Sequence, residues 1–387
     1  MGNSRGVIYS SFLVVTCIFI AFLFVLISSV SGAPDLPPII KFGELKSYIE
    51  PNLAVVESFY ESEANSPQMK SKHKKKKPVS RIIIVGDIHG CYDALKSLLK
   101  KANYDRKYDQ LVSLGDFISK GKQNFEVLDF LIENDAACVL GNHEVNILEK
   151  YASYYSYSSP KYCNSLENDT CVSEENLKMV TTEKPKFDLE LSIAKRLKPN
   201  HIDYLTNCSI LLDLGPIAHG FQKTHADVSQ PLFDSNGDTQ VSMKASDGSA
   251  SINYSKTIEG LAVHAGLQWH LDYIDQSVNT MVNLRALFKP NYTEPCFDSI
   301  RNIDETITKP WSEIWNIKQQ EKLNWSEGRM VFYGHEASRG LVEREYSTGL
   351  DTGCVAGKKL TAAVVTGKFS KKHKKTIYNS KIVQVSC

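Results

Sequence analysis

The chain has 387 residues, of which 42% are hydrophobic, so it is long enough to bury the core of one large domain or two ordinary ones. Its formal net charge is only +1, which excludes a protein whose whole surface attracts polyanions, so we expect no nucleic-acid partner.

The first predicted element is a membrane span. Residues 7–30 form an uncharged stretch of 24 residues, enough to cross a hydrocarbon core of about 30 Å, whereas the apolar part of a signal peptide has about 7–15 residues. Residues 1–33 are therefore predicted to be an uncleaved signal-anchor, although the small residues at 29–33 leave cleavage and secretion open as an alternative. The charges that flank the span are too few to fix its orientation.

Residues 34–80 are rich in Pro, Ser and Lys and are predicted to be a stem, with the catalytic domain spanning residues 81–387. Two basic clusters, residues 72–77 and 371–375, together contain nine lysines and no acid. Without those lysines the chain carries a net charge of −8. Most such runs are solvated tails, but we also expect that the strands following the two clusters pair and form one basic patch.

Five short apolar runs of strand character each end directly before Asp, Asn or His, in RIIIVGDIHG, QLVSLGD, AACVLGNHE, LAVHAG and MVFYGHE. Residues at strand ends are held by a rigid sheet, and the neighbouring glycines let the backbone turn closely. The runs therefore predict one site assembled from distant segments. Leucines recur at helical spacing after the first two runs, and the alternation of strand, ligand loop and helix predicts an α/β layered fold.

An insert is predicted at about residues 151–209 and a long polar loop at about 224–251. Five Asn-X-Ser/Thr sequons favour a lumenal or extracellular domain, and begin at Asn168, Asn207, Asn253, Asn291 and Asn324. Eight of the nine cysteines lie outside the predicted span, and Cys163 and Cys171 are close enough in sequence to form a disulfide in an oxidising compartment.

The residue types at the strand ends suit a divalent metal centre. Asp87 and His89 are two apart, so in an extended segment both side chains leave on one face, and Asp116 follows the next strand. Asn142 and His143 are adjacent, so one is available as a ligand while the other is free for proton transfer. Carboxylates, amide oxygens and imidazoles without thiolates suit Zn, Mn, Fe or Co, and two ions about 3.5–4 Å apart would share one carboxylate.

In this order, GDIHG, GDFISKG, GNHE, VHAG and YGHEASRG closely resemble the signature of the calcineurin-like metallophosphoesterases of the phosphoprotein-phosphatase superfamily, over about residues 81–366. The resemblance implies a two-layer β-sandwich flanked by helices and a dinuclear hydrolase. It places Asp87, His89 and Asp116 on one metal and His143 as the general acid. The second metal is expected to take Asp116, Asn142, His264 and His335.

The loop GDFISKG departs from the protein serine/threonine phosphatases of that family, which have Asp-Arg-Gly where this chain has Ser119-Lys120-Gly121. Lys120 offers a point charge for phosphate oxygens in place of a planar fork. Because position 119 is Ser, the carboxylate that orients the general acid in those phosphatases is missing. A phosphate leaving group needs less protonation than an alkoxide, so it tolerates this loss better. This loop and residues 347–365 resemble the diadenosine-tetraphosphatase-like branch, whose substrates contain phosphoanhydrides.

The membrane span and the sequons resemble the fungal vacuolar endopolyphosphatases within that branch. By this analogy, a metal-bound hydroxide cleaves inorganic polyphosphate internally, in an anchored protein whose catalytic domain lies in the vacuole lumen. Three alternatives stay open: a diadenosine polyphosphate or nucleotide pyrophosphohydrolase, a serine/threonine protein phosphatase, and a non-catalytic polyanion-binding protein. The sequence does not indicate the oligomeric state.

Several other residues have expected roles outside the metal ligands. Arg285 is either a second phosphate contact or an ordinary helix residue. Asp351, in GLDTG, is expected to support the backbone of a turn. The four histidines outside the motifs are expected to be structural or exposed, namely His201, His219, His225 and His270.

Overall fold

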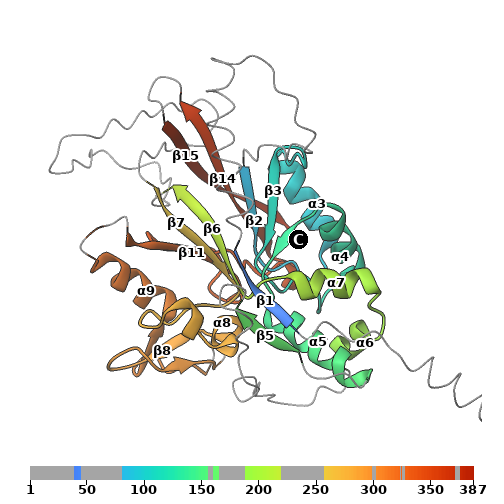
Figure 1. Ribbon diagram of the computed structural model, residues 1–387, viewed down its shortest axis with the longest axis horizontal. Coiled ribbons are helices and arrows are strands. Elements are labelled where there is room, and N and C mark those ends of the chain that lie inside the picture. The colour runs from blue at the N-terminus through green and yellow to red at the C-terminus, as the bar shows by residue number, and fades with distance from the viewer. Residues whose placement is uncertain are drawn as a thin grey trace, which may run out of the picture.

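A computed structural model describes residues 39–44, 81–155, 160–164, 188–218, 257–298, 302–322, 324, 327–370 and 375–387. Two large β-sheets pack face to face in the middle of the molecule, with helices outside them (Figure 1). This arrangement is an α/β fold with mixed sheets, as the alternation of strands and helices predicted.

The first sheet has five strands in the order β15-β14-β2-β3-β4. Strands β2, β3 and β4 are parallel, whereas β14 is antiparallel to both β2 and β15. The bounds are β2 Arg81–Val85, β3 Asp109–Ser113, β4 Ala137–Cys138, β14 Lys359–Ser370 and β15 Lys375–Ser386.

The expected pairing between the strands that follow the two basic clusters is wrong, because β14 lies between β2 and β15. Strand β15 pairs along its whole length with β14, its neighbour in sequence, as a hairpin. Arg81, where β2 begins, lies opposite Thr366 near the end of β14, so the chain enters β2 and leaves β14 at the same end of the sheet. That end is opposite to the one at which the loop after β2 begins. Nearly all of both clusters lies outside the described residues.

The second sheet has seven strands in the order β12-β13-β11-β7-β6-β1-β5. Residues 39–44 belong to the predicted stem, yet they form β1, which pairs with β5 and β6, so part of that segment joins the sheet. The bounds are β1 Ile39–Glu44, β5 Lys161–Asn164, β6 Leu211–Ala218, β7 Thr257–Val263, β11 Arg329–Tyr333, β12 Val342–Glu343 and β13 Ser347–Gly349.

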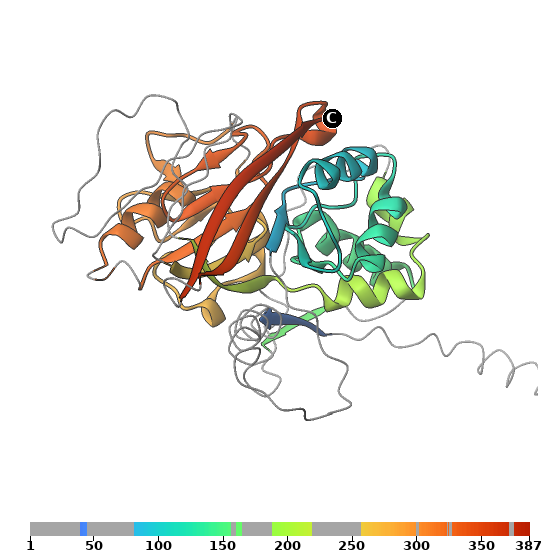
Figure 2. The same cartoon turned by 90° about the horizontal axis from the view of Figure 1, so that it is seen from above.

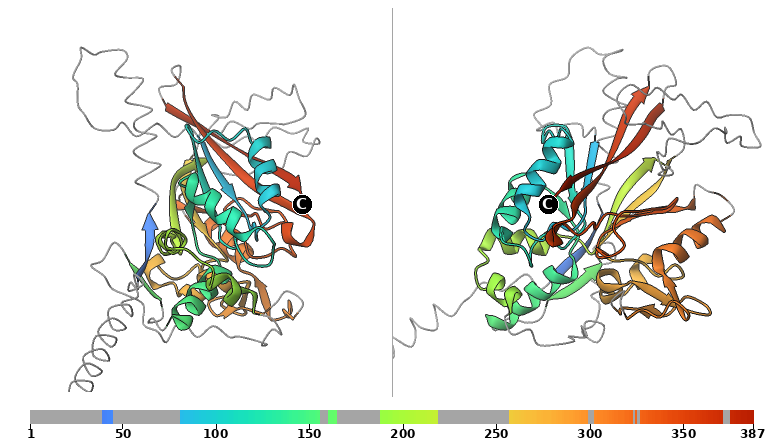
Figure 3. Two further views of the ribbon diagram at one scale, coloured as in Figure 1. Left: turned by 90° about the vertical axis from the view of Figure 1, so that its right-hand side faces the viewer. Right: turned by 180° about the vertical axis from the view of Figure 1, so that it is seen from behind.

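Two groups of helices cover the sheets on opposite sides, and the β14–β15 hairpin runs between the groups (Figure 2). One group comprises α3 Tyr92–Lys101, α4 Asn124–Glu133, α5 Asn142–Tyr154, α6 Leu189–Ala194 and α7 Pro199–Asn207. The other comprises α8 Val278–Asn283 and α9 Trp311–Gln320, beside a small sheet of β8 Ala286–Phe288, β9 Pro295–Cys296 and β10 Thr308–Pro310. Views from the side and from behind show the same division (Figure 3).

The predicted helical faces are present. In α3, Leu95, Leu98 and Leu99 are buried. In α4 the buried apolar residues are Val127, Leu128 and Leu131, while Phe125 and Ile132 are partly buried and pack at the margin of the core. These buried residues pack both helices against the sheet. The ligand loops that precede the two helices are therefore held in place.

Two disulfides join described residues, Cys138 to Cys208 and Cys354 to Cys387. The predicted pair Cys163 and Cys171 lies outside the residues whose side chains are described, and so does the loop at 224–251. In the described part of the chain, no helix combines the length and apolar character that a membrane crossing needs. Residues 7–30, the predicted span, are outside that part.

Candidate metal centre

The five strand ends converge as predicted. Asp87 and His89 follow β2, Asp116 follows β3, His264 follows β7 and His335 follows β11. Asn142 and His143 are the first two residues of α5, and Asn142 comes four residues after β4 ends. Each of these residues therefore lies on or directly after a short loop at the same edge of the sheets.

The backbone at these loops is strained. His89, Asp116 and His335 have φ values of +46°, +48° and +68°, which residues with a Cβ rarely adopt. Gly115 has a φ of +88°, and a Cβ there would lie 2.5 Å from the amide nitrogen of Gly141. The loops are thus held in conformations that local propensity does not favour, which is typical of functional sites.

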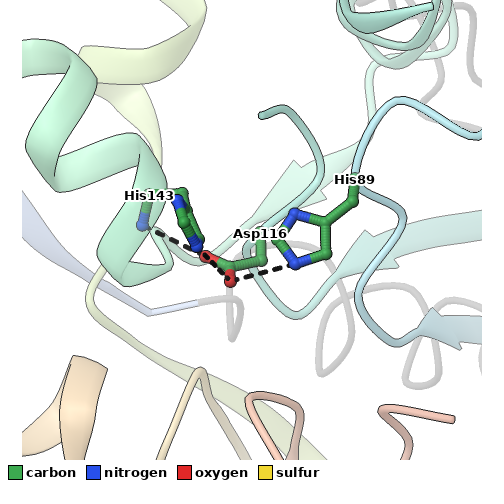
Figure 4. A group of neighbouring side chains, drawn as sticks. All are labelled: His89, Asp116 and His143. Atoms are coloured by element: carbon green, nitrogen blue, oxygen red, sulfur yellow. Dashed lines mark hydrogen bonds and ion pairs between the residues drawn. The ribbon is translucent and has the colours of Figure 1, made fainter. Parts of the chain in front are cut away.

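Asp116 is the centre of the arrangement, and its side chain is almost fully buried. Its Oδ2 lies 3.4 Å from His89 Nε2 and 3.8 Å from His143 Nε2, as Figure 4 shows. Its Oδ1 lies 3.4 Å from His264 Nε2 and accepts a hydrogen bond from the backbone N–H of His143. One carboxylate therefore faces two sets of imidazoles through its two oxygens.

The second set of ligand atoms has the predicted members. His264 Nε2 lies 3.2 Å from Asn142 Oδ1, and the rings of His264 and His335 are 5.0 Å apart. Ligand atoms of Asp116, His264 and His335 all lie within 4.8 Å of one another. The predicted set of Asp116, Asn142, His264 and His335 is thus brought together.

The first set differs in one member. Ligand atoms of His89, Asp116 and His143 form a second group within 4.8 Å of one another, and Asp87 is not part of it. Asp87 Oδ2 lies 4.0 Å from His89 Nε2, and its two oxygens are directed at the backbone N–H of His335, at 3.1 and 3.2 Å. Asp87 is therefore at the edge of this group.

Backbone carbonyls orient the imidazoles. His264 Nδ1 lies 2.8 Å from Leu114 O, and His89 Nδ1 lies 3.3 Å from Ile118 O, so the Nε2 atom of each ring faces Asp116. Burial lowers the pKa of His89 to about 3 and also lowers the pKa of His264 and of His335. These rings are neutral at physiological pH, which is the form that binds a metal.

The pKa values of the acidic residues are those expected at a site that binds cations. Burial and the neighbouring carboxylates of Asp351 and Asp116 raise the pKa of Asp87 well above its usual range, and burial raises the pKa of Asp351. Although burial opposes it, the nearby histidines hold the pKa of Asp116 below its usual range. His335 Nε2 is buried and has no hydrogen-bond partner among the described residues. Buried carboxylates that lie close together and an imidazole nitrogen without a hydrogen-bond partner are groups that a bound divalent ion would stabilise.

Glu144 supports the centre, although it is not among the site residues predicted from the sequence. It is fully buried in the first turn of α5, and its carboxylate accepts hydrogen bonds from the backbone N–H groups of Asp116, Ile118 and Gly141. Burial, with the charge of Asp116, raises the pKa of Glu144 to about 8. The signal was present, because Glu144 is the last residue of GNHE.

The two predicted substrate contacts also lie at the centre. Lys120 is exposed, and its Nζ lies 3.0 Å from His89 Nε2. Arg285 immediately precedes β8 and donates from Nη1 to His335 O at 3.4 Å. Asp351 supports a turn as expected, because its Oδ1 accepts from Gly353 N–H.

Glu190 is a residue that sequence reasoning missed. Its Oε1 lies 2.6 Å from His143 Nδ1, so His143 has a carboxylate partner although position 119 is Ser. The inference that His143 lacks such a partner is wrong, because Glu190 lies in the insert, 47 residues further along the chain, and no local pattern marks it. Burial lowers the pKa of His143, but Asp116 and the bond to Glu190 outweigh burial and raise it above its usual value.

The histidines outside the motifs play no part in this cluster where they are described. His201 is buried, and its Nε2 lies 2.7 Å from Asp129 Oδ1, while His270 is exposed. His219 and His225 are outside the described residues.

The profile of the calcineurin-like phosphoesterases matches residues 80–242, which contain the first three ligand loops. The chain carries a calcineurin-like metallophosphoesterase domain. It is therefore an enzyme of the hydrolase class, and two groups of its residues are arranged so that each could hold a divalent metal ion.

Several curated proteins are similar to this chain at modest sequence identity. A symmetrical bis(5'-nucleosyl)-tetraphosphatase of Actinobacillus pleuropneumoniae is 25% identical over 289 residues, which are 72% of this chain and 93% of the relative. A zinc-dependent endopolyphosphatase of Saccharomyces cerevisiae is 25% identical over 315 residues, which are 79% and 80% of the two chains. A solved structure of a putative diadenosine tetraphosphatase is 21% identical, covers 80% of this chain and 94% of its own, and has a TM-score of 0.48.

Proposed function

We propose that this metallophosphoesterase hydrolyses phosphoanhydride bonds, with inorganic polyphosphate as its substrate. One observation carries the two-metal part of the proposal: each oxygen of the buried Asp116 carboxylate faces a different set of imidazoles. A carboxylate in that position would be able to contribute one oxygen to each of two ions.

The proposed ligands keep the second set and, in the first set, take Asp87 in place of His143. Asp87, His89 and Asp116 would hold one ion, and the other would be held by Asp116, Asn142, His264 and His335. Although His143 falls in the first group, its Nδ1 is bonded to Glu190, and we assign its Nε2 to proton transfer. When bound, the ions neutralise charge on the transferring phosphoryl group and lower the pKa of water, so that it attacks near neutral pH.

The residues of the chain supply positioning and protons. In hydrolysis the oxygen of a water bonds to phosphorus while the bridging P–O bond breaks, and the departing oxygen takes a proton. His143 Nε2, which lies 3.8 Å from Asp116 Oδ2, would supply that proton. Lys120 Nζ lies next to His89, where it adds positive charge for non-bridging oxygens, and Arg285 is the second candidate phosphate contact.

Phosphoanhydride substrates are supported by the names of the relatives, which refer to bis(5'-nucleosyl) tetraphosphate and to polyphosphate. Polyphosphate is favoured because the apolar stretch at 7–30 and the sequons resemble the fungal vacuolar endopolyphosphatases. A bis(5'-nucleosyl) tetraphosphate is the second candidate. Since Glu190 gives His143 a carboxylate partner, Ser119 no longer argues against phosphomonoesters, so a phosphopeptide belongs in the same test.

Cleavage is proposed to be internal, because the ligands come from five separate strand ends, as expected for an open groove that could hold a polyphosphate chain through its middle. The basic clusters would then act away from the bond that breaks. Strand β2 has five residues, about 16 Å at 3.3 Å per residue, and separates Arg81 from the ligand loop. Lysines that precede Arg81 would therefore attract a long polyanion and leave the chemical step unchanged.

The proposed location is an oxidising compartment, with the vacuole lumen as the specific expectation and secretion as the alternative. Three of the five sequon asparagines are described and exposed, namely Asn207, Asn291 and Asn324, and two disulfides join described cysteines. Membrane anchoring is proposed only from the apolar sequence at 7–30.

The experiment that tests the substrate is a comparison of kcat/KM for the full-length, zinc-loaded protein on long-chain polyphosphate, diadenosine tetraphosphate and a phosphoserine peptide. The proposal predicts the highest value for polyphosphate, with chains of intermediate length early in the digest. Preference for either of the other two substrates would contradict it. Orthophosphate beside full-length polyphosphate, with nothing between, would contradict internal cleavage alone.

A further inference from the structure

The insert between α5 and α7 brings a carboxylate to the general acid of the proposed reaction. Glu190 lies in the first turn of α6, and its Oε1 is 2.6 Å from His143 Nδ1. The side chains of Glu190 and His143 are 15% and 17% exposed, so water competes little for this hydrogen bond.

Both oxygens of Glu190 are held by α5. Lys150 Nζ donates to Glu190 Oε2 at 2.7 Å, while Oε1 is bonded to His143. His143 and Lys150 are seven residues apart on one helix, which places them on the same face two turns from each other. Lys150 also donates to Asp188 Oδ1 at 2.7 Å, and Asp188 caps α6 by accepting from Leu191 N–H. The carboxylate is thereby fixed in position before any substrate is bound.

The contact determines which nitrogen of His143 is presented to substrate. A carboxylate only accepts hydrogen bonds when ionised, so Nδ1 is the donor in this pair, and Nε2 faces Asp116 Oδ2 at 3.8 Å. An imidazole held in this way delivers its Nε2 proton in one orientation, as in hydrolases in which a carboxylate orients the catalytic histidine.

The loop that carries this carboxylate in related phosphatases offers none here. Ser119 occupies that position and is 2% exposed, with a φ of +79°. We propose that Glu190 is the positioning residue for His143 and replaces the missing loop carboxylate, which makes the insert part of the catalytic apparatus. The kinetic consequence rests on the proposed function, whereas the hydrogen bond does not.

The test compares Glu190→Gln with Asp188→Asn in the full-length, zinc-loaded protein. Glutamine keeps the size of the side chain and loses its charge. Asp188→Asn removes a neighbouring carboxylate charge that pairs with Lys150 and leaves both contacts of Glu190, to His143 and to Lys150, in place. Proton NMR of protein labelled with ¹⁵N-histidine should show a strongly downfield Nδ1–H signal for His143, identified by its loss in His143→Asn.

The expected results separate positioning from a purely structural role. Glu190→Gln should shift the His143 signal upfield and lower kcat on polyphosphate about 100-fold with KM nearly unchanged, at the low end of what general acid catalysis contributes. Asp188→Asn should keep the signal and most of kcat. The proposal is overturned if Glu190→Gln retains the signal, or if both variants lose kcat equally. If the signal behaves as expected but the wild type does not cleave polyphosphate, the proposed substrate fails and the positioning role stands.

Discussion

The disulfide between Cys138 and Cys208 closes the chain segment that carries Glu190. Cys138 lies four residues before Asn142, and Cys208 directly follows α7 at the end of the insert. Ser209 N–H donates to Cys138 O, so the backbones meet beside the bridge. The end of the insert is thereby tied to β4, the strand that precedes the general acid.

Removing this disulfide should lower stability substantially. The bridge spans a sequence separation of 70, and in the chain-entropy account a loop of that length stabilises the folded state by about 4 kcal/mol. We expect the double variant Cys138→Ser, Cys208→Ser to unfold at a clearly lower denaturant concentration, and Cys354→Ser, Cys387→Ser, whose bridge has a sequence separation of 33, to lose somewhat less stability. Equal midpoints for the wild type with and without reductant would show that neither bridge forms.

The stability of the metal-free protein should have an unusual pH dependence. The pKa of Glu144 is about 8 in the folded protein, against 4.5 normally, so the folded state binds this proton more tightly and stability rises as pH falls from about 8 to 6.5. Below 6.5 the trend reverses, because His89, His264 and His335 have lowered pKa values and the unfolded chain takes up those protons. His143, with a raised pKa, acts in the same direction as Glu144.

Urea unfolding in the presence of a chelator at pH 5, 6.5 and 8 measures this dependence. Glu144→Gln is the informative variant, since its amide must oppose at least one of the three backbone N–H donors. We expect a loss of about 1–3 kcal/mol at pH 6.5 and a smaller change between pH 6.5 and 8. Wild-type stability that increases steadily from pH 5 to 8 would refute this account.

Neutralising both basic clusters should affect long substrates alone. With the lysines of residues 72–77 and 371–375 replaced by Gln, KM for long-chain polyphosphate should rise several-fold with kcat unchanged, and the salt dependence of kcat/KM should weaken. Tripolyphosphate serves as the matched control because it is too short to reach from the site to the far end of β2. An equal rise in KM for both substrates would place the clusters at the site itself.

The exposed sequons predict a glycoprotein. Endoglycosidase treatment of protein purified from its native source should increase its mobility on a gel, and Asn291→Gln with Asn324→Gln should reduce that shift. Unchanged mobility would argue against passage through the secretory pathway, and hence against the proposed location.

The centre was largely predictable because its ligands follow strands whose apolar runs are continuous in sequence. Asp87, Asp116 and His264 each come within three residues of a strand end, so pattern and position agree. Two features escaped prediction for physical reasons. Glu190 reaches His143 because α6 packs on α5, a tertiary contact that no local sequence pattern shows. The order of strands β2, β14 and β15 depends on the β14–β15 hairpin, and apolar runs alone do not specify which strands pair.

Backbone conformation was also beyond the sequence. His89, Asp116 and His335 adopt positive φ values that their own propensities disfavour, and the surrounding loops impose them. Glycines beside these positions were visible in the motifs, yet the direction in which each side chain leaves the loop was not.

The measurement that tests the central claim most directly is the metal content and polyphosphate turnover of Asp116→Asn, determined on one preparation. Asp116 faces both imidazole sets, so replacing one of its oxygens by an amide nitrogen removes the bridge. We predict about two zinc ions per chain in the wild type, and fewer bound ions with no measurable turnover in the variant. Two ions per chain and wild-type turnover in Asp116→Asn would contradict the two-metal account.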